Sequence, residues 1–135
     1  MISAVDSSVL LDVLTDDAEF AERSEAVLRR ASREGQLVLC ECVVAEILPA
    51  FSDTAEFDLF LAEWELRFIP SSRASAVLAG RHFSTYLARA GKPKRIVADF
   101  LIGAHAKLHA DRLVARDRGY LRDYFAGLTL LDPSR

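Results

Sequence analysis

The chain has 135 residues, of which 51% are apolar and 27% are charged, and its formal net charge is −3. These values fit a globular domain that buries its own core, and the slight acidity excludes a general, charge-driven nucleic-acid binder. A nuclease that recruits phosphate through bound cations remains compatible with this charge. No apolar run approaches the ~20 residues of a membrane span. Because a basic export signal is also absent, we expect a cytoplasmic chain with no membrane partner.

The sequence predicts strands and helices in alternation. In chain order they are a strand at 2–6, helices at 9–15 and 18–34, a strand at 36–40, helices at 41–48 and 57–68, a short strand at 67–70, helices at 72–90 and 96–110, and strands at 112–116 and 128–132. Strands separated by helices favour an α/β fold. We expect a three-layer α/β/α sandwich with a central, mostly parallel sheet, formed as a single domain over residues 1–135.

Individual residues mark the expected ends of helices. Ser7 or Ser8 can cap the first helix, because a serine hydroxyl accepts from the free amides of the first turn. Gly35 ends the helix at 18–34. Pro49 lacks a backbone amide proton and therefore ends or kinks the helix before it.

Two acidic residues follow predicted strands. Asp6 ends the first strand, and Asp117 comes directly after the strand at 112–116. The carboxyl ends of parallel strands meet at one edge of a sheet, where α/β proteins form their ligand crevice. Asp99 lies in the first turn of a predicted helix and can face the same crevice. Glu46 lies within an apolar helical segment, where an unpaired carboxylate is costly to bury.

Four carboxylates in such settings predict a divalent-metal site. Hard oxygen ligands suit Mg²⁺, with Mn²⁺ as an alternative, and these ions keep positions for water and substrate phosphate. Carboxylates packed closely repel one another, and a bound cation relieves that repulsion. Ser7 or Ser8 can also hydrogen-bond a ligand or a water at such a site, although helix capping is favoured for them.

Each acid except the glutamate also has a purely structural interpretation. Asp6 can cap the first helix, and Asp99 can favour its own helix through the helix dipole. Asp117 can be a turn residue that pairs with Arg116 or Arg118. Taken singly, the two interpretations are about equal, and the joint occurrence of the acids favours the metal site.

Two further pairs of potential metal ligands carry weaker signals. Cys40 and Cys42 are one residue apart, a poor spacing for a mutual disulfide, and we expect buried free thiols rather than a metal pair. His105 and His109 share a helix face and can bind zinc. The glutamate of the HExxH motif is absent, however, so core or surface histidines are favoured.

Basic residues near the acids have open roles. Lys92, Lys94 and Arg95 precede Asp99 and form either a solvated loop or a guide for an RNA backbone. The arginines on both sides of Asp117 either hold that carboxylate or contact phosphate. The sequence does not separate these roles.

Five segments together resemble the PIN-domain ribonuclease family, specifically its VapC-type toxins of bacterial toxin–antitoxin pairs. They are VDSSVLLDVL at 5–14, VVAEIL at 43–48, VADFLIGAHA at 97–106, LVARDRGYL at 113–121 and LTLLDP at 128–133. The resemblance covers nearly the whole chain and implies a parallel sheet flanked by helices. It also implies four acidic metal ligands and catalytic residues: Asp6, Glu46, Asp99 and Asp117.

The resemblance implies a function as well. We expect a Mg²⁺-dependent endoribonuclease in which metal-activated water hydrolyses RNA phosphodiesters, leaving a 5′-phosphate and a 3′-hydroxyl. The expected partners are an RNA substrate, a cognate antitoxin and a second copy of the chain in a homodimer. The alternatives are a non-catalytic PIN-like module whose acids bind a cation or a partner arginine, and a receiver-like signalling domain. The receiver-like domain lacks support, because its phosphoacceptor aspartate and strand-ending lysine are not found.

Aromatic residues at helical spacing add one further expectation. Phe57, Phe60, Trp64 and Phe68 predict one apolar helix face, which is favoured as part of the core. In the resembling toxins a hydrophobic groove receives an antitoxin helix. If the aromatic residues serve that role here, Trp64 is expected to be only partly buried.

Overall fold

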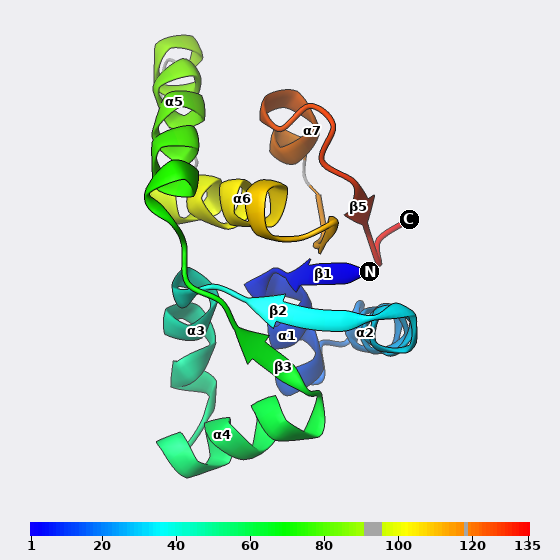
Figure 1. The fold of residues 1–135 in the computed structure, drawn as a ribbon. Helices are drawn as coiled ribbons and strands as arrows, with labels where there is room; N and C mark the ends of the chain where they lie inside the picture. Colours follow the sequence, from blue (N-terminus) through cyan, green and yellow to red (C-terminus); the bar gives the residue numbers. More distant parts are fainter. Residues whose placement is uncertain (91–95, 118) are drawn as a thin grey trace.

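The computed structural model describes residues 1–90, 96–117 and 119–135, and its centre is an all-parallel sheet (Figure 1). Within these residues the sheet has five strands in the order β3-β2-β1-β4-β5. They are β1 (Ile2–Val5), β2 (Gln36–Leu39), β3 (Leu66–Phe68), β4 (Arg112–Val114) and β5 (Leu130–Leu131). The expected parallel sheet is confirmed, including the short strand after the aromatic segment.

Helices connect consecutive strands and form two outer layers. They are α1 (Ser7–Leu14), α2 (Ala21–Glu34), α3 (Glu41–Ile47), α4 (Thr54–Glu63), α5 (Arg73–Arg89), α6 (Val97–His109) and α7 (Tyr120–Tyr124), with a 3₁₀ turn, η1 (Leu48–Ala50), after α3. Right-handed crossovers place α1 to α4 on one side and α5 to α7 on the other, as Figure 1 shows. The three-layer α/β/α architecture is therefore confirmed. No helix in the described parts of the chain is both long and apolar enough to cross a membrane.

The order of the strands creates a crevice beside β1. The chain moves outward from β1 to β2 and β3, then crosses back to the opposite edge of β1 to form β4. At such a reversal, the connections that follow β1 and β4 leave their carboxyl ends in opposite directions. Open α/β sheets bind ligands in the crevice between such strand ends. Val5 and Val114 are register partners at this point. The residues that follow them therefore meet at one edge of the sheet.

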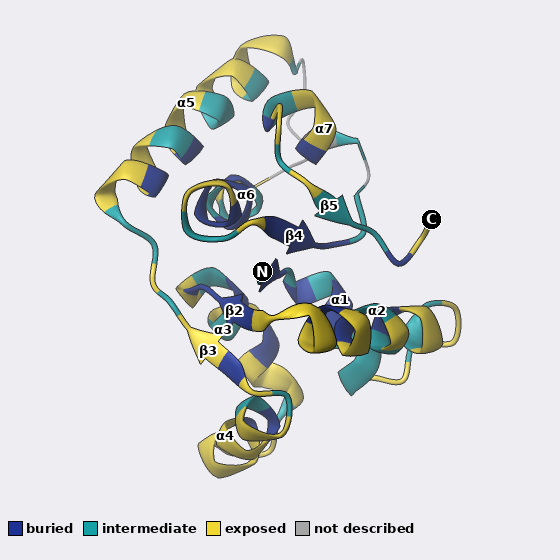
Figure 2. Ribbon diagram, turned by 45° about the vertical axis from the view of Figure 1, so that its right-hand side comes forward, coloured by how far each residue is buried: buried dark blue, intermediate teal, exposed yellow. Residues whose placement is uncertain are grey.

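The core lies between the sheet and the two helical layers. Figure 2 shows buried residues concentrated in the strands and on the inner sides of the helices. Strands β1, β2 and β4 are buried along most of their length, as parallel strands covered on both faces must be. On the α5–α7 side, Phe100 is fully buried and contacts the rings of Phe83, Tyr86 and Tyr124.

Two glycines permit close approaches that a side chain would block. A Cβ atom at Gly35 would lie 1.8 Å from the carbonyl oxygen of Met1, so the start of β2 could not reach β1. A Cβ atom at Gly103 in α6 would lie 2.6 Å from the ring of Phe125. Gly35 also ends α2 as expected, and Pro49 lies in the 3₁₀ turn that follows α3.

Two features differ from the sequence prediction. Phe68 is not part of a helix face with Phe57 and Phe60; it lies in β3 and is 48% exposed. The physical reason is Glu65, whose φ of 52° breaks the helical path directly after Trp64. The short helix α7, which the sequence analysis did not predict, follows the end of β4.

Candidate functional site

Asp6 lies at the switch point, directly after β1. Its backbone amide donates to the carbonyl oxygen of Val114 at 2.9 Å and so extends the pairing of β1 with β4. Its carboxylate caps α1: Oδ2 accepts from the amide of Ser8 at 3.3 Å and from the Ser8 hydroxyl at 2.5 Å. Burial, and then the negative charge of Asp99, raise the pKa of the Asp6 carboxyl. Asp6 therefore caps α1, but its hydrogen bonds to Ser8 do not offset the effect of burial and of Asp99 on its pKa.

Glu46 reaches the same place from α3. The hydroxyl of Ser7 donates to its Oε1 at 3.1 Å, which ties the carboxylate to the first turn of α1. Burial of the carboxyl raises the pKa of Glu46, and the negative charges of Asp6 and Asp99 raise it further. A carboxylate that is repelled by two others favours a proton or a cation.

Asp99 contributes from the opposite helical layer. It lies in the first turn of α6, where Oδ2 accepts from the amide of Ile96 at 3.4 Å. Its charge acts on both Asp6 and Glu46. The charges of three predicted site residues thus act on one another, with Asp6 directly before α1, Glu46 in α3 and Asp99 in α6.

Asp117 is placed at the same edge but has partners of its own. Its side chain is 1% exposed, and Oδ1 accepts from the amides of Gly119 at 2.9 Å and Leu121 at 3.2 Å. Oδ2 pairs with Nε of Arg122 at 3.1 Å. In this structure the Asp117 carboxylate therefore organises the start of α7.

The arginine that the sequence placed beside Asp117 has a different partner. Arg116 pairs with Asp12 of α1 and not with Asp117. Asp12 was not singled out by the sequence, because no local pattern links it to a residue 104 positions away. The remaining basic candidates, which are Lys92, Lys94, Arg95 and Arg118, lie outside the described residues.

The donor atoms at the switch point fit a hard divalent cation. They are carboxylate oxygens with a serine hydroxyl beside them, and their mutual repulsion is of the kind that a bound cation relieves. Within residues 1–90, 96–117 and 119–135, no three acidic, histidine or cysteine side chains stand close enough together to hold an ion as they are placed. The three carboxylates therefore interact through their charges, without forming a closed cage.

The histidine and cysteine pairs do not form such a site. His105 is buried, and its Nε2 lies 2.7 Å from the carbonyl oxygen of Ile69. Nε2 of His109 lies 3.0 Å from the hydroxyl of Ser72. Both rings thus join α6 to the segment between β3 and α5, in keeping with the structural interpretation. Cys40 and Cys42 are free thiols, as expected, and burial is the main cause that raises the pKa of Cys42 to about 12.

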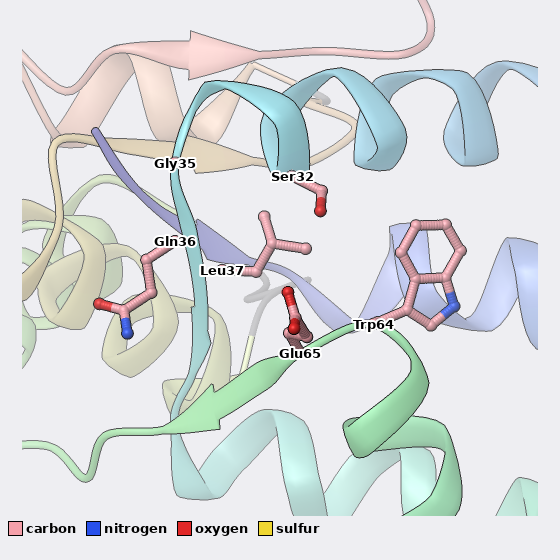
Figure 3. Close-up of a pocket in the computed structure, with 6 residues that line it drawn as sticks. All are labelled: Ser32, Gly35, Gln36, Leu37, Trp64 and Glu65. Atoms are coloured by element: carbon pink, nitrogen blue, oxygen red, sulfur yellow. The ribbon is translucent and has the colours of Figure 1, made fainter.

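A second surface feature surrounds Trp64, which lies shortly before β3 and beside the start of β2, at the amino ends of the strands. Three adjoining hollows share its indole ring, and the largest has a volume of about 450 Å³. Figure 3 shows Trp64 facing Ser32 and Leu37 across one of them. The guanidinium carbon of Arg29 lies 5.3 Å from the centre of the indole ring, which is only partly buried. Trp64 therefore has the partial exposure expected of a residue that meets a partner.

A family model described as "PIN domain" matches residues 4–125. No match was found among curated proteins. VapBC2 from Rickettsia felis, solved with a DNA fragment from its promoter, is 17% identical with a TM-score of 0.72, and the match covers 98% of each chain.

Two further solved structures have the same fold. VapBC-1 from nontypeable Haemophilus influenzae is 16% identical over 100% of both chains, with a TM-score of 0.70. VapC20 from Mycobacterium tuberculosis, described as a sarcin-ricin loop cleaving toxin, is 14% identical with a TM-score of 0.63. That match covers 97% of this chain and 99% of VapC20. At these identities the structural likeness concerns the fold.

Proposed function

Because the chain belongs to the PIN-domain family, we propose that it is a divalent-metal-dependent endoribonuclease and the toxin of a toxin–antitoxin pair. The observation that carries this proposal is the position of two carboxylates at the switch point of the sheet: the Asp6 amide bonds Val114 at the end of β4, and the neighbouring Ser7 bonds Glu46. The charge of Asp99 acts on both carboxylates. Asp6 and Asp99 each cap a helix, but capping does not require Glu46 beside them, and the repulsion among the three charges opposes folding. Such a costly arrangement is typical of a site that holds a cation and binds phosphate.

The proposed ligands are Asp6, Glu46 and Asp99, and Mg²⁺ is the proposed ion, with Mn²⁺ as an alternative. Asp117 is the fourth proposed member, and it acts from the neighbouring strand end, where Arg122 now pairs with its carboxylate. A bound ion supplies a water of lowered pKa and stabilises charge on the phosphoryl oxygens. Ser7 and Ser8 hold the carboxylates of Glu46 and Asp6 in place.

The proposal extends to substrate, partners and location. The substrate is RNA, whose phosphodiester is hydrolysed to a 5′-phosphate and a 3′-hydroxyl. The partners are a cognate antitoxin and a second copy of the chain, and the chain acts in the cytoplasm as a single PIN-like domain. Support for an antitoxin comes from the fold, which is shared with toxins solved as toxin–antitoxin complexes. The half-buried Trp64 offers an apolar contact for such a partner.

One substitution tests the catalytic proposal. Asp99→Ala should abolish metal-dependent RNA cleavage while the fold stays intact, which circular dichroism and thermal unfolding would verify. Asp111→Ala is the matched control, because Asp111 is an exposed aspartate that binds the amide of Ile2 at the opposite end of the sheet. Undiminished cleavage by Asp99→Ala, or products with 2′,3′-cyclic phosphate ends, would refute the proposal.

A non-catalytic PIN-like module is the second candidate function. The observation in its favour is Asp117, whose carboxylate is already bound by Arg122 and by two backbone amides. In such a module the acids would only bind a cation or an arginine of a partner. The chain would then bind Mg²⁺ or Mn²⁺ without cleaving any RNA.

A further inference from the structure

An ion pair joins α1, the helix that follows β1, to the segment that follows β4, beside the candidate site. Nε of Arg116 donates to Oδ2 of Asp12 at 2.9 Å, and Nη2 donates to Oδ1 at 3.0 Å. The Asp12 side chain is 4% exposed and that of Arg116 is 18% exposed. The hydroxyl of Ser24 donates to Asp12 at 2.7 Å. Both oxygens of this carboxylate are therefore bound, and one of them is bound twice.

The guanidinium group of Arg116 is also fixed on its face. Its central carbon lies 4.3 Å from the centre of the Phe20 ring, which gives a cation–π contact. Two of its nitrogens are engaged by Asp12. A group that is held at its edge and on its face, and whose charge is already neutralised, is not the contact for an RNA phosphate. Of the two roles that the sequence left open, phosphate binding is thus disfavoured.

We propose that Asp12 and Arg116 are positioning residues for the acidic site, an inference that rests on the proposed function. Asp12 belongs to α1, the helix that begins at Asp6, and Arg116 directly precedes Asp117. The two parallel hydrogen bonds fix an orientation as well as a distance, which an apolar contact does not do. The pair thereby sets where the segment after β4 leaves the sheet, and with it the place of the Asp117 carboxylate.

The same strand provides a matched control. Arg112 is at the opposite, amino end of β4, where Nε donates to the Ser3 hydroxyl at 2.8 Å and Nη2 pairs with Glu34 at 3.4 Å. Its side chain is 6% exposed, so Arg112 is more deeply buried than Arg116. An arginine-to-lysine change removes the planar fork at either position. Only the change at Arg116 touches the carboxyl edge of the sheet.

Amide hydrogen exchange on the metal-free chain is the first measurement. The amides of Gly119 and Leu121 donate to Asp117, so their protection reports where its carboxylate lies. In Arg116→Lys and in Asp12→Asn these amides should exchange at least about tenfold faster. Opening of the segment after β4 breaks the Arg116–Asp12 pair in the unchanged chain, and in the variants it no longer has this cost. In Arg112→Lys they should stay as protected as in the unchanged chain. Equal protection in all variants would overturn the inference.

Metal binding and kinetics are the second measurement. Calorimetry with Mn²⁺ should show affinity reduced about 10- to 100-fold in Arg116→Lys and Asp12→Asn, with kcat lowered and KM for RNA little changed. Arg112→Lys should match the unchanged chain in Mn²⁺ affinity and in kcat, even if its unfolding temperature falls as much as that of Arg116→Lys. If all three variants lose activity only in proportion to stability, the pair is merely structural and the inference is wrong.

The outcomes separate this inference from the proposed function. If the unchanged chain neither binds Mn²⁺ nor cleaves RNA, the proposed function fails, and the exchange data still decide whether the pair positions Asp117. If Arg116→Lys does not fold, Ser24→Ala replaces it, because this change removes only one donor to Asp12. Ser24→Ala should accelerate exchange of the same two amides several-fold, and unchanged exchange would contradict the inference.

Discussion

The hydroxyl of Ser7 donates to the carboxylate of Glu46 at 3.1 Å and so connects the first turn of α1 with α3. Ser7 is buried, and it comes directly after Asp6. The Ser7 hydroxyl therefore holds Glu46, from the connection between β2 and β3, beside the start of α1, where Asp6 lies. The sequence analysis favoured helix capping for the serines, but the cap of α1 is Asp6.

The bond from Ser7 predicts a loss of metal affinity when it is removed. Ser7→Ala should weaken Mn²⁺ binding about 10- to 100-fold and lower the free energy of unfolding by about 1 kcal/mol. Calorimetry and urea unfolding measure the two effects. Thr15→Ala is the control, since its hydroxyl donates to the carbonyl of Leu11 in the same helix, away from the acids. Equal Mn²⁺ affinity in Ser7→Ala and the unchanged chain would contradict this role.

The repulsion among the acids predicts that one substitution stabilises the metal-free chain. Asp6→Asn keeps a good N-cap for α1 and removes a buried charge that lies near Asp99 and Glu46. The free energy of unfolding should rise by about 1 kcal/mol, or roughly 2–8 °C in Tm. Saturating Mg²⁺ should raise Tm in the unchanged chain but not in Asp6→Asn. A lower Tm in metal-free Asp6→Asn would show that the Ser8 contacts outweigh the repulsion.

His105 predicts a loss of stability in acid. Burial of the ring lowers the pKa of His105 below 6.5, and the neighbouring His109 adds to this effect. The unfolded chain therefore takes up a proton as pH falls through 6.5 while folded His105 stays neutral. The free energy of unfolding should decrease over this range and stop decreasing below the folded pKa.

The variant His105→Gln isolates this contribution, because all other groups titrate in both chains. Urea unfolding at a series of pH values from about 8 to about 5 should give a flatter profile for His105→Gln than for the unchanged chain. Parallel profiles would mean that His105 carries a proton in the folded chain as readily as in the unfolded one.

Trp64 predicts the surface that an antitoxin covers. Trp64→Ala should weaken binding of the cognate antitoxin at least about tenfold, because a partly buried aromatic ring is a typical anchor. Phe68→Ala is the control, since Phe68 is an exposed aromatic residue outside the three hollows. Titration calorimetry with the purified antitoxin measures both. Unchanged affinity in Trp64→Ala would place the antitoxin elsewhere.

The layered fold was predictable because its signals are local. Apolar runs at 37–40 and 113–115, each flanked by helical periodicity, suffice to predict the strands at 36–40 and 112–116, and the structure confirms both. The helix α7 was not predictable, since its five residues have no apolar periodicity and depend on Asp117 at their start. Phe68 followed the helical spacing by coincidence, and the turn at Glu65 was decided by a backbone conformation that sequence spacing does not encode.

The site was predictable only in part, for a related reason. Asp6 and Glu46 were identified by their context, one at a strand end and the other in an apolar helix, and in the structure the charges of Asp6 and Asp99 both raise the pKa of Glu46. The partners of Asp117 and Arg116 were not predictable. Both side chains are satisfied by residues whose proximity depends on the tertiary fold, and in the case of Asp12 on a contact across most of the chain.

The central position of β1 has a consequence for synthesis. Residues 2–5 leave the ribosome long before residues 112–114, and one edge of β1 stays unpaired until the latter have emerged. A nascent chain therefore carries an open strand edge, and with it a risk of aggregation, through most of its translation. The pairing of β1 with β4 joins residues far apart in the sequence and is therefore slow to form. The crevice beside β1 is therefore complete only after residues 112–114 have emerged from the ribosome.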